Sequence, residues 1–162
     1  MTFFTGLRCS ICHAEFPAEA LYVCDKCLGP LEATYDEQAR RKNVTRELIQ
    51  SRPASLWRYR EFLPIEGEPR TGLHSGCTPL IRSERLAQEL GLKELYLKDD
   101  SVNHPTLSYK DRVVPVAATR AVELGLKVFA CASTGNLGNS VAAHAARLGL
   151  ECYVFIPKDL EP

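Results

Sequence analysis

The sequence has no excess of charge of either sign and no long run of apolar residues. Its 162 residues include 20 basic and 20 acidic side chains, so the formal net charge is zero. A neutral chain has no general attraction to nucleic acid or to an anionic membrane surface. No segment approaches the roughly 18 apolar residues that a membrane-spanning helix needs. We therefore expect a protein that binds neither nucleic acid nor membrane.

The first residues also lack the features of an export signal. Residues 1–8 contain no basic stretch followed by an apolar run and a cleavage site, so we expect a cytoplasmic protein. Disulfide frameworks are rare in that reducing compartment, and the seven cysteines must be explained otherwise. Hydrophobic residues make up 45% and charged residues 25%, which is typical of one globular domain with a small appendage.

Four of the cysteines form two pairs with the same internal spacing. The pairs are Cys9-Ser-Ile-Cys12 and Cys24-Asp-Lys-Cys27, eleven residues apart. Two such pairs can place four thiolates around one Zn²⁺, and the residues between them suit the strands of a zinc ribbon. Bound metal would stabilise a unit that is too small to have its own core. We therefore predict a structural zinc knob, similar to a zinc ribbon, over residues 1–34.

Other interpretations of the cysteines stay open. Cys9 to His13 match a haem-attachment pattern, although the second pair and the missing export signal argue against haem. A rubredoxin-like iron site and a nucleic-acid-binding ribbon are further alternatives, and the latter would need a dense basic patch that is missing. The remaining cysteines are expected to be buried small residues: Cys77, Cys131 and Cys152.

The rest of the chain divides into a linker and an α/β segment. Residues 35–78, first charged and then interrupted by prolines and glycines, are predicted to be a helical and irregular linker that wraps the core. Beyond it we expect strands at 94–98, 127–132 and 152–156, and helices at 83–91, 108–125 and 139–148. The strand, helix and strand at the end form a βαβ unit, which predicts a parallel sheet with helices on both faces. Because the chain stops just after a strand, residues 79–162 are expected to be an incomplete domain of a longer protein.

Lys110 lies where a helix is expected to begin. The sequence Ser108-Tyr-Lys-Asp111 has the spacing of a capping box, which places Lys110 in the first helical turn. The positive end of the helix dipole disfavours an ammonium there, and burial would lower the lysine pKa further. A neutral amine is the nucleophile that condenses with aldehydes. On spacing alone, an ordinary solvated turn formed by residues 110–112 explains the pattern equally well.

Residues 103–112 resemble the lysine segment of the fold type II pyridoxal-phosphate-dependent enzymes, in the form that threonine synthases have, Asn-Pro-Thr-Gly-Ser-Phe-Lys-Asp-Arg. Further stretches agree with that family in the same order along the chain: Leu56-Trp-Arg-Tyr-Arg60, Gly76-Cys-Thr-Pro-Leu80, Leu95-Tyr-Leu-Lys-Asp-Asp100 and Ala130-Cys-Ala-Ser-Thr-Gly-Asn-Leu137. Five ordered matches are far more specific than one. There are also departures, since Leu107 stands where the family often has glycine and His104 is inserted beside Asn103.

The resemblance implies a set of functional residues. Lys110 would be the catalytic lysine that binds pyridoxal phosphate covalently, and Asn136 would donate a hydrogen bond to the cofactor oxygen beside the aldehyde carbon. Ser133, Thr134 and Gly135 would form the turn that binds the substrate carboxylate, because a turn before a helix presents free N–H groups to an anion. Without the lysine, the same turn would be interpreted as an ordinary link between a strand and a helix. His74 and His144 are expected to be packing or surface residues.

The resemblance also implies an activity, that of a lyase that converts O-phospho-L-homoserine and water to L-threonine and phosphate. A cysteate synthase-like or serine/threonine dehydratase-like enzyme stays open, as does a zinc-ribbon interaction module followed by an inactive remnant. The glycine-rich loop for the cofactor phosphate and the contact to the pyridine nitrogen are expected beyond this sequence, so the 162 residues alone should be inactive. For the phosphate of this amino-acid phosphate substrate, Lys98 and Arg112 are the candidate cations within the chain. A homodimer stays open for the full-length protein.

Overall fold

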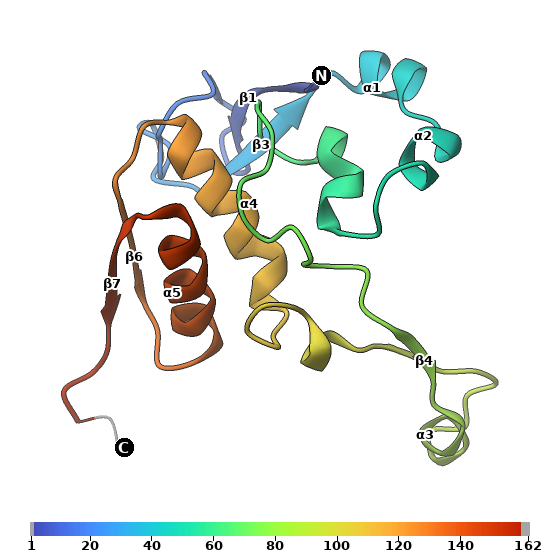
Figure 1. Cartoon of the computed structure of the whole chain (residues 1–162). Coiled ribbons are helices and arrows are strands. Elements are labelled where there is room, and N and C mark those ends of the chain that lie inside the picture. Colours follow the sequence, from blue (N-terminus) through green and yellow to red (C-terminus); the bar gives the residue numbers. More distant parts are fainter. Residues whose placement is uncertain (1, 160–162) are drawn as a thin grey trace.

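The computed structural model describes residues 2–159, and its N-terminal part is a small antiparallel sheet (Figure 1). Strand β1 (Phe4–Cys9) lies between β2 (Glu15–Phe16) and β3 (Leu31–Tyr35), in the order β2-β1-β3. The register of β1 and β3 runs from Phe4 opposite Tyr35 to Cys9 opposite Leu31. Of the stretch between the cysteine pairs, where strands are predicted, only Glu15–Phe16 is a strand, and its partners lie before and after the pairs. The division of the chain into domains stays a prediction.

The linker contains short helices on the surface. Neither α1 (Glu37–Asn43) nor α2 (Arg46–Gln50) buries a residue, as expected for a charged segment. The 3₁₀ helix η1 (Leu56–Phe62) buries Trp57, whose indole N–H donates to the carbonyl oxygens of Thr71 at 3.1 Å and Gly72 at 2.9 Å. The buried aromatic side chain thus joins two parts of the irregular linker.

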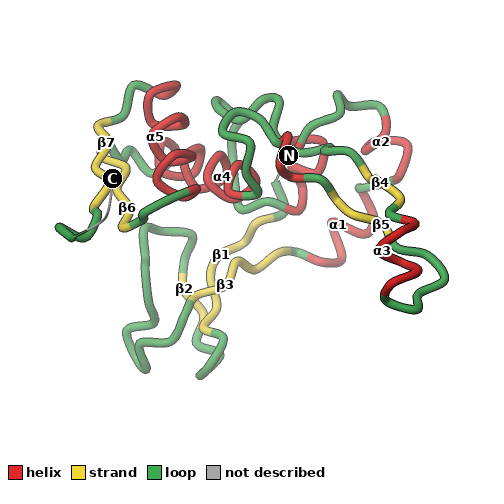
Figure 2. Tube along the Cα trace, turned by 90° about the horizontal axis from the view of Figure 1, so that it is seen from below, coloured by secondary structure: helices red, strands yellow, loops and turns green. Residues whose placement is uncertain are grey.

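A second pair of strands follows the linker. Strand β4 (Leu80–Arg82) pairs antiparallel with β5 (Tyr96–Lys98), and α3 (Glu84–Glu89) lies between them in sequence. The predicted helix and strand are therefore present, although Ser83 makes no side-chain capping bond. A short 3₁₀ helix, η2 (Asp100–Val102), leads to the lysine segment. Figures 1 and 2 place β4, β5 and α3 at the opposite end of the molecule from the C-terminal strands.

The C-terminal part confirms the predicted βαβ unit. Strands β6 (Val128–Ala132) and β7 (Glu151–Phe155) are parallel, and α5 (Asn136–Leu148) connects them and packs on both. Helix α5 begins three residues earlier than predicted, because the N–H of Asn139 already bonds to the carbonyl of Gly135 at 3.2 Å. Within residues 2–159 the parallel sheet has two strands, and the predicted strand β5 belongs to a separate antiparallel pair.

Helix α4 (Lys110–Glu123) packs against α5 through small buried side chains. The buried apolar residues of the two helices include Val114, Ala118 and Ala121 on α4 and Val141 and Ala145 on α5. Such residues let two helices approach closely. As Figure 1 shows, the first turns of both helices lie at the same end of the pair. The packing therefore brings the lysine segment close to the turn that precedes α5.

Among the helices in the described part of the chain, none has the length and apolar character needed to cross a membrane.

Candidate functional site

Lys110 is the first residue of α4, as the sequence predicts, and its side chain is half-buried. Its Nζ lies 4.7 Å from the centre of the Tyr109 ring. Among residues 2–159 Lys110 forms no ion pair, whereas Arg112 pairs with Asp100 and Asp111 is fully buried. The alternative of an ordinary solvated turn is therefore wrong. Of the three charged side chains, only that of Lys110 has no ionic or hydrogen-bonded partner among the described residues.

The expected capping box does not form. The hydroxyl of Ser108 accepts from the N–H of Lys110 at 3.1 Å, and the carboxylate of Asp111 does not return to Ser108. It accepts instead from the N–H and the hydroxyl of Thr106, both at 2.8 Å. Its other oxygen accepts from the hydroxyl of Ser140 in α5 at 2.6 Å. The carboxylate is therefore used inside the protein, and the helix begins at Lys110, one residue later than a capping box with Ser108 as N-cap requires.

The loop before Lys110 is held by a buried asparagine. The side-chain oxygen of Asn103 accepts from the N–H of Gly76 at 2.8 Å, and its amide nitrogen donates to the carbonyl of Ser108 at 2.9 Å. Leu107 has a φ of 58°, in the left-handed region that favours glycine. This conformation explains why glycine suits the position in the family that the lysine segment resembles.

Arg112 and Lys98 are both engaged within the chain. The guanidinium of Arg112 binds both carboxylate oxygens of Asp100 at 2.7 Å and the hydroxyl of Thr78 at 2.8 Å. These hydrogen bonds from Arg112 hold the pKa of Asp100 at about 2, below its ordinary value of 3.8. The amine of Lys98 donates to the carbonyl of Thr78. Neither cation is therefore free to bind a substrate phosphate without giving up these contacts.

The turn before α5 is open to solvent. The N–H of Ser133 donates to the carbonyl of Phe155 at 3.1 Å, and its hydroxyl accepts from the N–H of Gly135 at 3.2 Å. Thr134, Gly135 and Asn136 are exposed, and a Cβ at Gly135 would meet no atom within 4 Å. The turn borders a depression of about 380 Å³. Since the first N–H groups of a helix have no partner within it, the turn has both the space and the donors to bind an anion.

The lysine and the turn are neighbours along α5. Asp111, next to Lys110, bonds to Ser140, which lies four residues after Asn136. Four residues correspond to about 6 Å of helix rise. The structure therefore brings the predicted cofactor lysine and the predicted carboxylate turn to the same end of the α4–α5 pair. Asn136 is the first residue of α5. The sequence had predicted that the helix starts later, at residue 139.

His144 is buried between segments that are distant in sequence. Only 1% of its surface is exposed. Its Nδ1 lies 2.7 Å from the hydroxyl oxygen of Thr71, and its Nε2 lies 3.4 Å from an oxygen of Asp111. Burial lowers the pKa of His144 below its ordinary value, so the ring is neutral at pH 7. The sequence analysis missed the contacts of Thr71 and Ser140 and the burial of Asp111. No local pattern predicts such contacts, since Thr71 and His144 are 73 residues apart.

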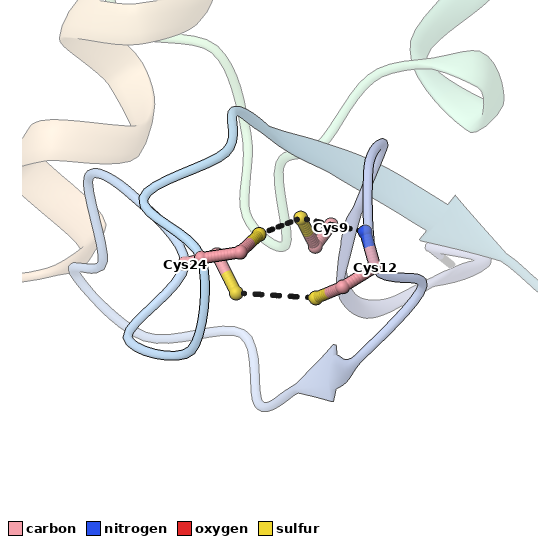
Figure 3. A group of neighbouring side chains, drawn as sticks. Cys9, Cys12 and Cys24 are labelled. Carbon is pink, nitrogen blue, oxygen red and sulfur yellow. Dashed lines mark hydrogen bonds between the residues drawn. The ribbon is translucent and has the colours of Figure 1, made fainter.

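The four cysteines of the predicted knob come together at the end of β1, and Figure 3 labels three of them, Cys9, Cys12 and Cys24. Their sulfur atoms all lie within 4.8 Å of one another, with Cys9 and Cys27 at 3.4 Å and Cys12 and Cys24 at 3.5 Å. Four sulfurs bound tetrahedrally to Zn²⁺ at about 2.3 Å would lie about 3.8 Å apart. The donor set and its spacing therefore fit one zinc ion.

The two cysteine pairs share one backbone geometry. His13 and Leu28, each directly after a pair, have φ values of 61° and 58°. Their N–H groups bond to the carbonyl oxygens of Cys9 and Cys24 at 3.1 and 2.9 Å. The sulfur of Cys9 accepts from backbone N–H groups, first that of Cys12, and these lower the pKa of the Cys9 thiol to about 6. For Cys27 the N–H of Gly29 lowers the pKa, but the neighbouring thiols, that of Cys9 first, raise it to about 12. Of these two neighbouring sulfurs, Cys9 is therefore the one that favours the thiolate form a metal binds.

The remaining cysteines are less buried than predicted. Cys77 is exposed, with a φ of 48°, and Cys131 and Cys152 are half-buried. The prediction of burial is wrong for Cys77, because the turn that contains it directs the side chain outward.

The model of the pyridoxal-phosphate-dependent enzyme family matches residues 72–162. This segment contains the lysine loop, α4, the turn before α5 and the parallel strands. The match therefore covers every residue that was predicted to contact cofactor or substrate.

Similar proteins are threonine synthases. The chain is 44% identical to that of Methanocaldococcus jannaschii over 153 residues, which are 93% of this chain and 37% of the relative. It is 40% identical to that of Methanosarcina acetivorans over 93% of this chain and 36% of the relative. The threonine synthase of Halalkalibacterium halodurans is 46% identical over 64% of this chain. The chain thus spans little more than a third of the length of the first two relatives, and both alignments extend into the cysteine knob.

Proposed function

The chain belongs to the pyridoxal-phosphate-dependent enzyme family, and we propose that the full-length protein is a threonine synthase. Its reaction would convert O-phospho-L-homoserine and water to L-threonine and phosphate. The observation that carries this proposal is the identity of 44% with a threonine synthase along 93% of the chain. Because the chain covers 37% of that relative, the activity is proposed for the full-length protein and not for these residues alone.

Lys110 is proposed to hold the cofactor through its Nζ, and Asn136 through a hydrogen bond. Pyridoxal phosphate, when bound, stabilises negative charge on substrate carbons by withdrawing electrons. The availability of the Lys110 amine, next to a buried Asp111 and a paired Arg112, supports its assignment. Its Nζ is also the group that would remove and return protons at the α and β carbons of the substrate.

The turn formed by Ser133, Thr134 and Gly135 is proposed to bind the substrate carboxylate. Its exposed backbone and the start of α5 supply N–H donors and a favourable dipole for an anion. The phosphate of the substrate needs a separate cationic site, since a buried dianion without positive partners is costly. Because Arg112 and Lys98 are already engaged, we assign that site to the remaining part of the full-length protein.

We also propose that Cys9, Cys12, Cys24 and Cys27 hold one structural zinc ion. The separation of their sulfur atoms and the repeated backbone geometry support it. Cytoplasmic location and assembly as a homodimer stay predictions, which fractionation and sedimentation of the full-length protein would test.

The test of the proposed function is turnover by the full-length protein. Incubation with O-phospho-L-homoserine should release phosphate and threonine in equal amounts. Lys110→Ala should abolish the release, and Lys127→Ala, a change of an exposed lysine directly before β6, should not. Deamination of threonine or serine without turnover of phosphohomoserine would indicate a dehydratase instead. Sulfite-dependent turnover of phosphoserine would indicate a cysteate synthase.

A further inference from the structure

Asp111 is the centre of a buried polar network that joins four segments of the chain. Its carboxylate is fully buried and accepts hydrogen bonds from Thr106 in the lysine loop and from Ser140 in α5. His144 of α5 lies 3.4 Å away and contacts Thr71 of the linker at 2.7 Å. A buried carboxylate is stable only when its oxygens have partners. The network therefore fixes these segments relative to the residue that follows Lys110.

The contact with His144 favours one arrangement of protons. Its Nε2 lies 3.4 Å from an oxygen of Asp111 without forming a hydrogen bond, and the attraction of the carboxylate favours the proton of the neutral ring on Nε2. Nδ1 then accepts from the hydroxyl of Thr71. Thr71, His144 and Asp111 thus form a chain of polar contacts that resembles a catalytic triad in composition. Because Thr71 and His144 are each only 1% exposed, no substrate can reach them. These three residues therefore have a supporting role and not a catalytic one.

The other end of α4 is held by different contacts. Arg120 donates to Glu66 at 2.7 Å and to the carbonyl of Ala18 in the knob at 2.5 Å. Glu123 accepts from the N–H groups of Glu66 and Gly67. The helix is therefore anchored independently at its C-terminal half. Loss of the Asp111 network should loosen the lysine end of α4 without releasing the helix.

We propose that Asp111 is a positioning residue for Lys110, which sets the place of the lysine relative to the turn at residues 133–136. This inference rests on the proposed role of Lys110 and deepens it. The carboxylate bonds to Ser140, one turn into α5, and so links the backbone beside Lys110 to the helix whose first N–H groups face the substrate. Asp111 itself touches neither cofactor nor substrate, because it is fully buried.

The test uses two changes in the full-length protein and one control. Asp111→Asn replaces one of the two acceptor oxygens with an amide nitrogen, which cannot accept a hydrogen bond. In one orientation of the amide the N–H of Thr106 loses its acceptor, and in the other the hydroxyl of Ser140 does. Ser140→Ala removes one hydrogen bond and is the milder change if Asp111→Asn fails to fold. Val141→Ala is the control, because Val141 is equally buried on α5 but contributes only packing. It should lower the melting temperature and leave the lysine in place.

The readouts separate positioning from stability. The visible absorption band of the cofactor on Lys110, titrated with pH, should have a shifted midpoint in Asp111→Asn and Ser140→Ala and an unchanged one in Val141→Ala. The value of kcat should fall roughly ten- to a hundredfold in Asp111→Asn, with a smaller change in KM, since a small misplacement of a reacting group has that effect.

The outcomes distinguish this inference from the proposed function. If the unmodified protein shows no band from a cofactor on Lys110, the proposed function and the inference both fail. If the band is present and both network variants change only the melting temperature, as Val141→Ala does, the positioning role alone is refuted.

Discussion

Replacing Gly72 with alanine should be among the most damaging small changes in the linker. Gly72 has a φ of 61°, and a Cβ there would lie 2.4 Å from the Cβ of Pro115 in α4. The left-handed conformation alone costs an alanine about 1 kcal/mol. Forcing an atom into a packed interface typically costs a further 1 to 3 kcal/mol, in order-of-magnitude terms. Gly72→Ala should therefore destabilise the protein by about 2 to 4 kcal/mol.

Gly91 provides a matched control for this prediction. Its φ is 66°, and a Cβ at that position would meet no atom within 4 Å. Gly91→Ala should therefore cost only the conformational term of about 1 kcal/mol. Urea denaturation of the full-length protein would compare the two variants. If Gly72→Ala proves no less stable than Gly91→Ala, the linker does not pack on Pro115 as described, and the argument is wrong.

Three further predictions concern the ion pair, the metal and the lysine loop. Because the hydrogen bonds from Arg112, with the one from Thr78, hold the pKa of Asp100 near 2 and not at 3.8, this partly exposed pair should stabilise the protein at pH 7 by about 1 kcal/mol. That contribution is complete above the ordinary pKa and disappears as the pH falls toward 2, so acid unfolding of wild type and Arg112→Met should converge at low pH and differ at pH 7. Metal analysis should find one zinc per chain, and the Cys12→Ser variant should lose it. Chelation should alter the knob while β6, α5 and β7 stay folded. Absence of metal, or covalently bound haem, would contradict the zinc site. Leu107→Gly should leave the melting temperature unchanged or raise it, because glycine adopts the left-handed conformation at φ 58° without strain and this gain offsets its entropy cost. A clear drop in melting temperature would contradict the described loop conformation.

Local patterns were sufficient for features that depend on local chemistry. The spacing of the cysteine pairs predicted a cluster of four sulfurs, because each pair forms its own tight turn. The βαβ unit was predicted from apolar strands around a helix of small residues, and the parallel pairing of β6 and β7 confirms it. Lys110 was placed correctly at the start of a helix.

Features that depend on distant partners could not be predicted in this way. The capping box at Ser108 was wrong because the acceptor oxygens of Asp111 find Thr106 and Ser140, and Ser140 lies 29 residues away. Strand β5 was expected, but its partner β4 was not, since three residues of the segment after Pro79 show no clear periodicity. The start of α5 was missed by three residues because Gly135 and Asn136 are typical of turns. For Asp111 and for β4, a partner distant in sequence decides the structure.

The most direct test of the account is to identify the lysine that carries the cofactor. Borohydride reduction of the full-length protein should fix a pyridoxyl group on the peptide that contains Ser108 to Arg112, and mass spectrometry should locate it on Lys110. Lys98, which donates to the carbonyl of Thr78, and Lys127, which is exposed directly before β6, should remain unlabelled. A pyridoxyl group on either of those lysines, or on none in this chain, would contradict the central claim.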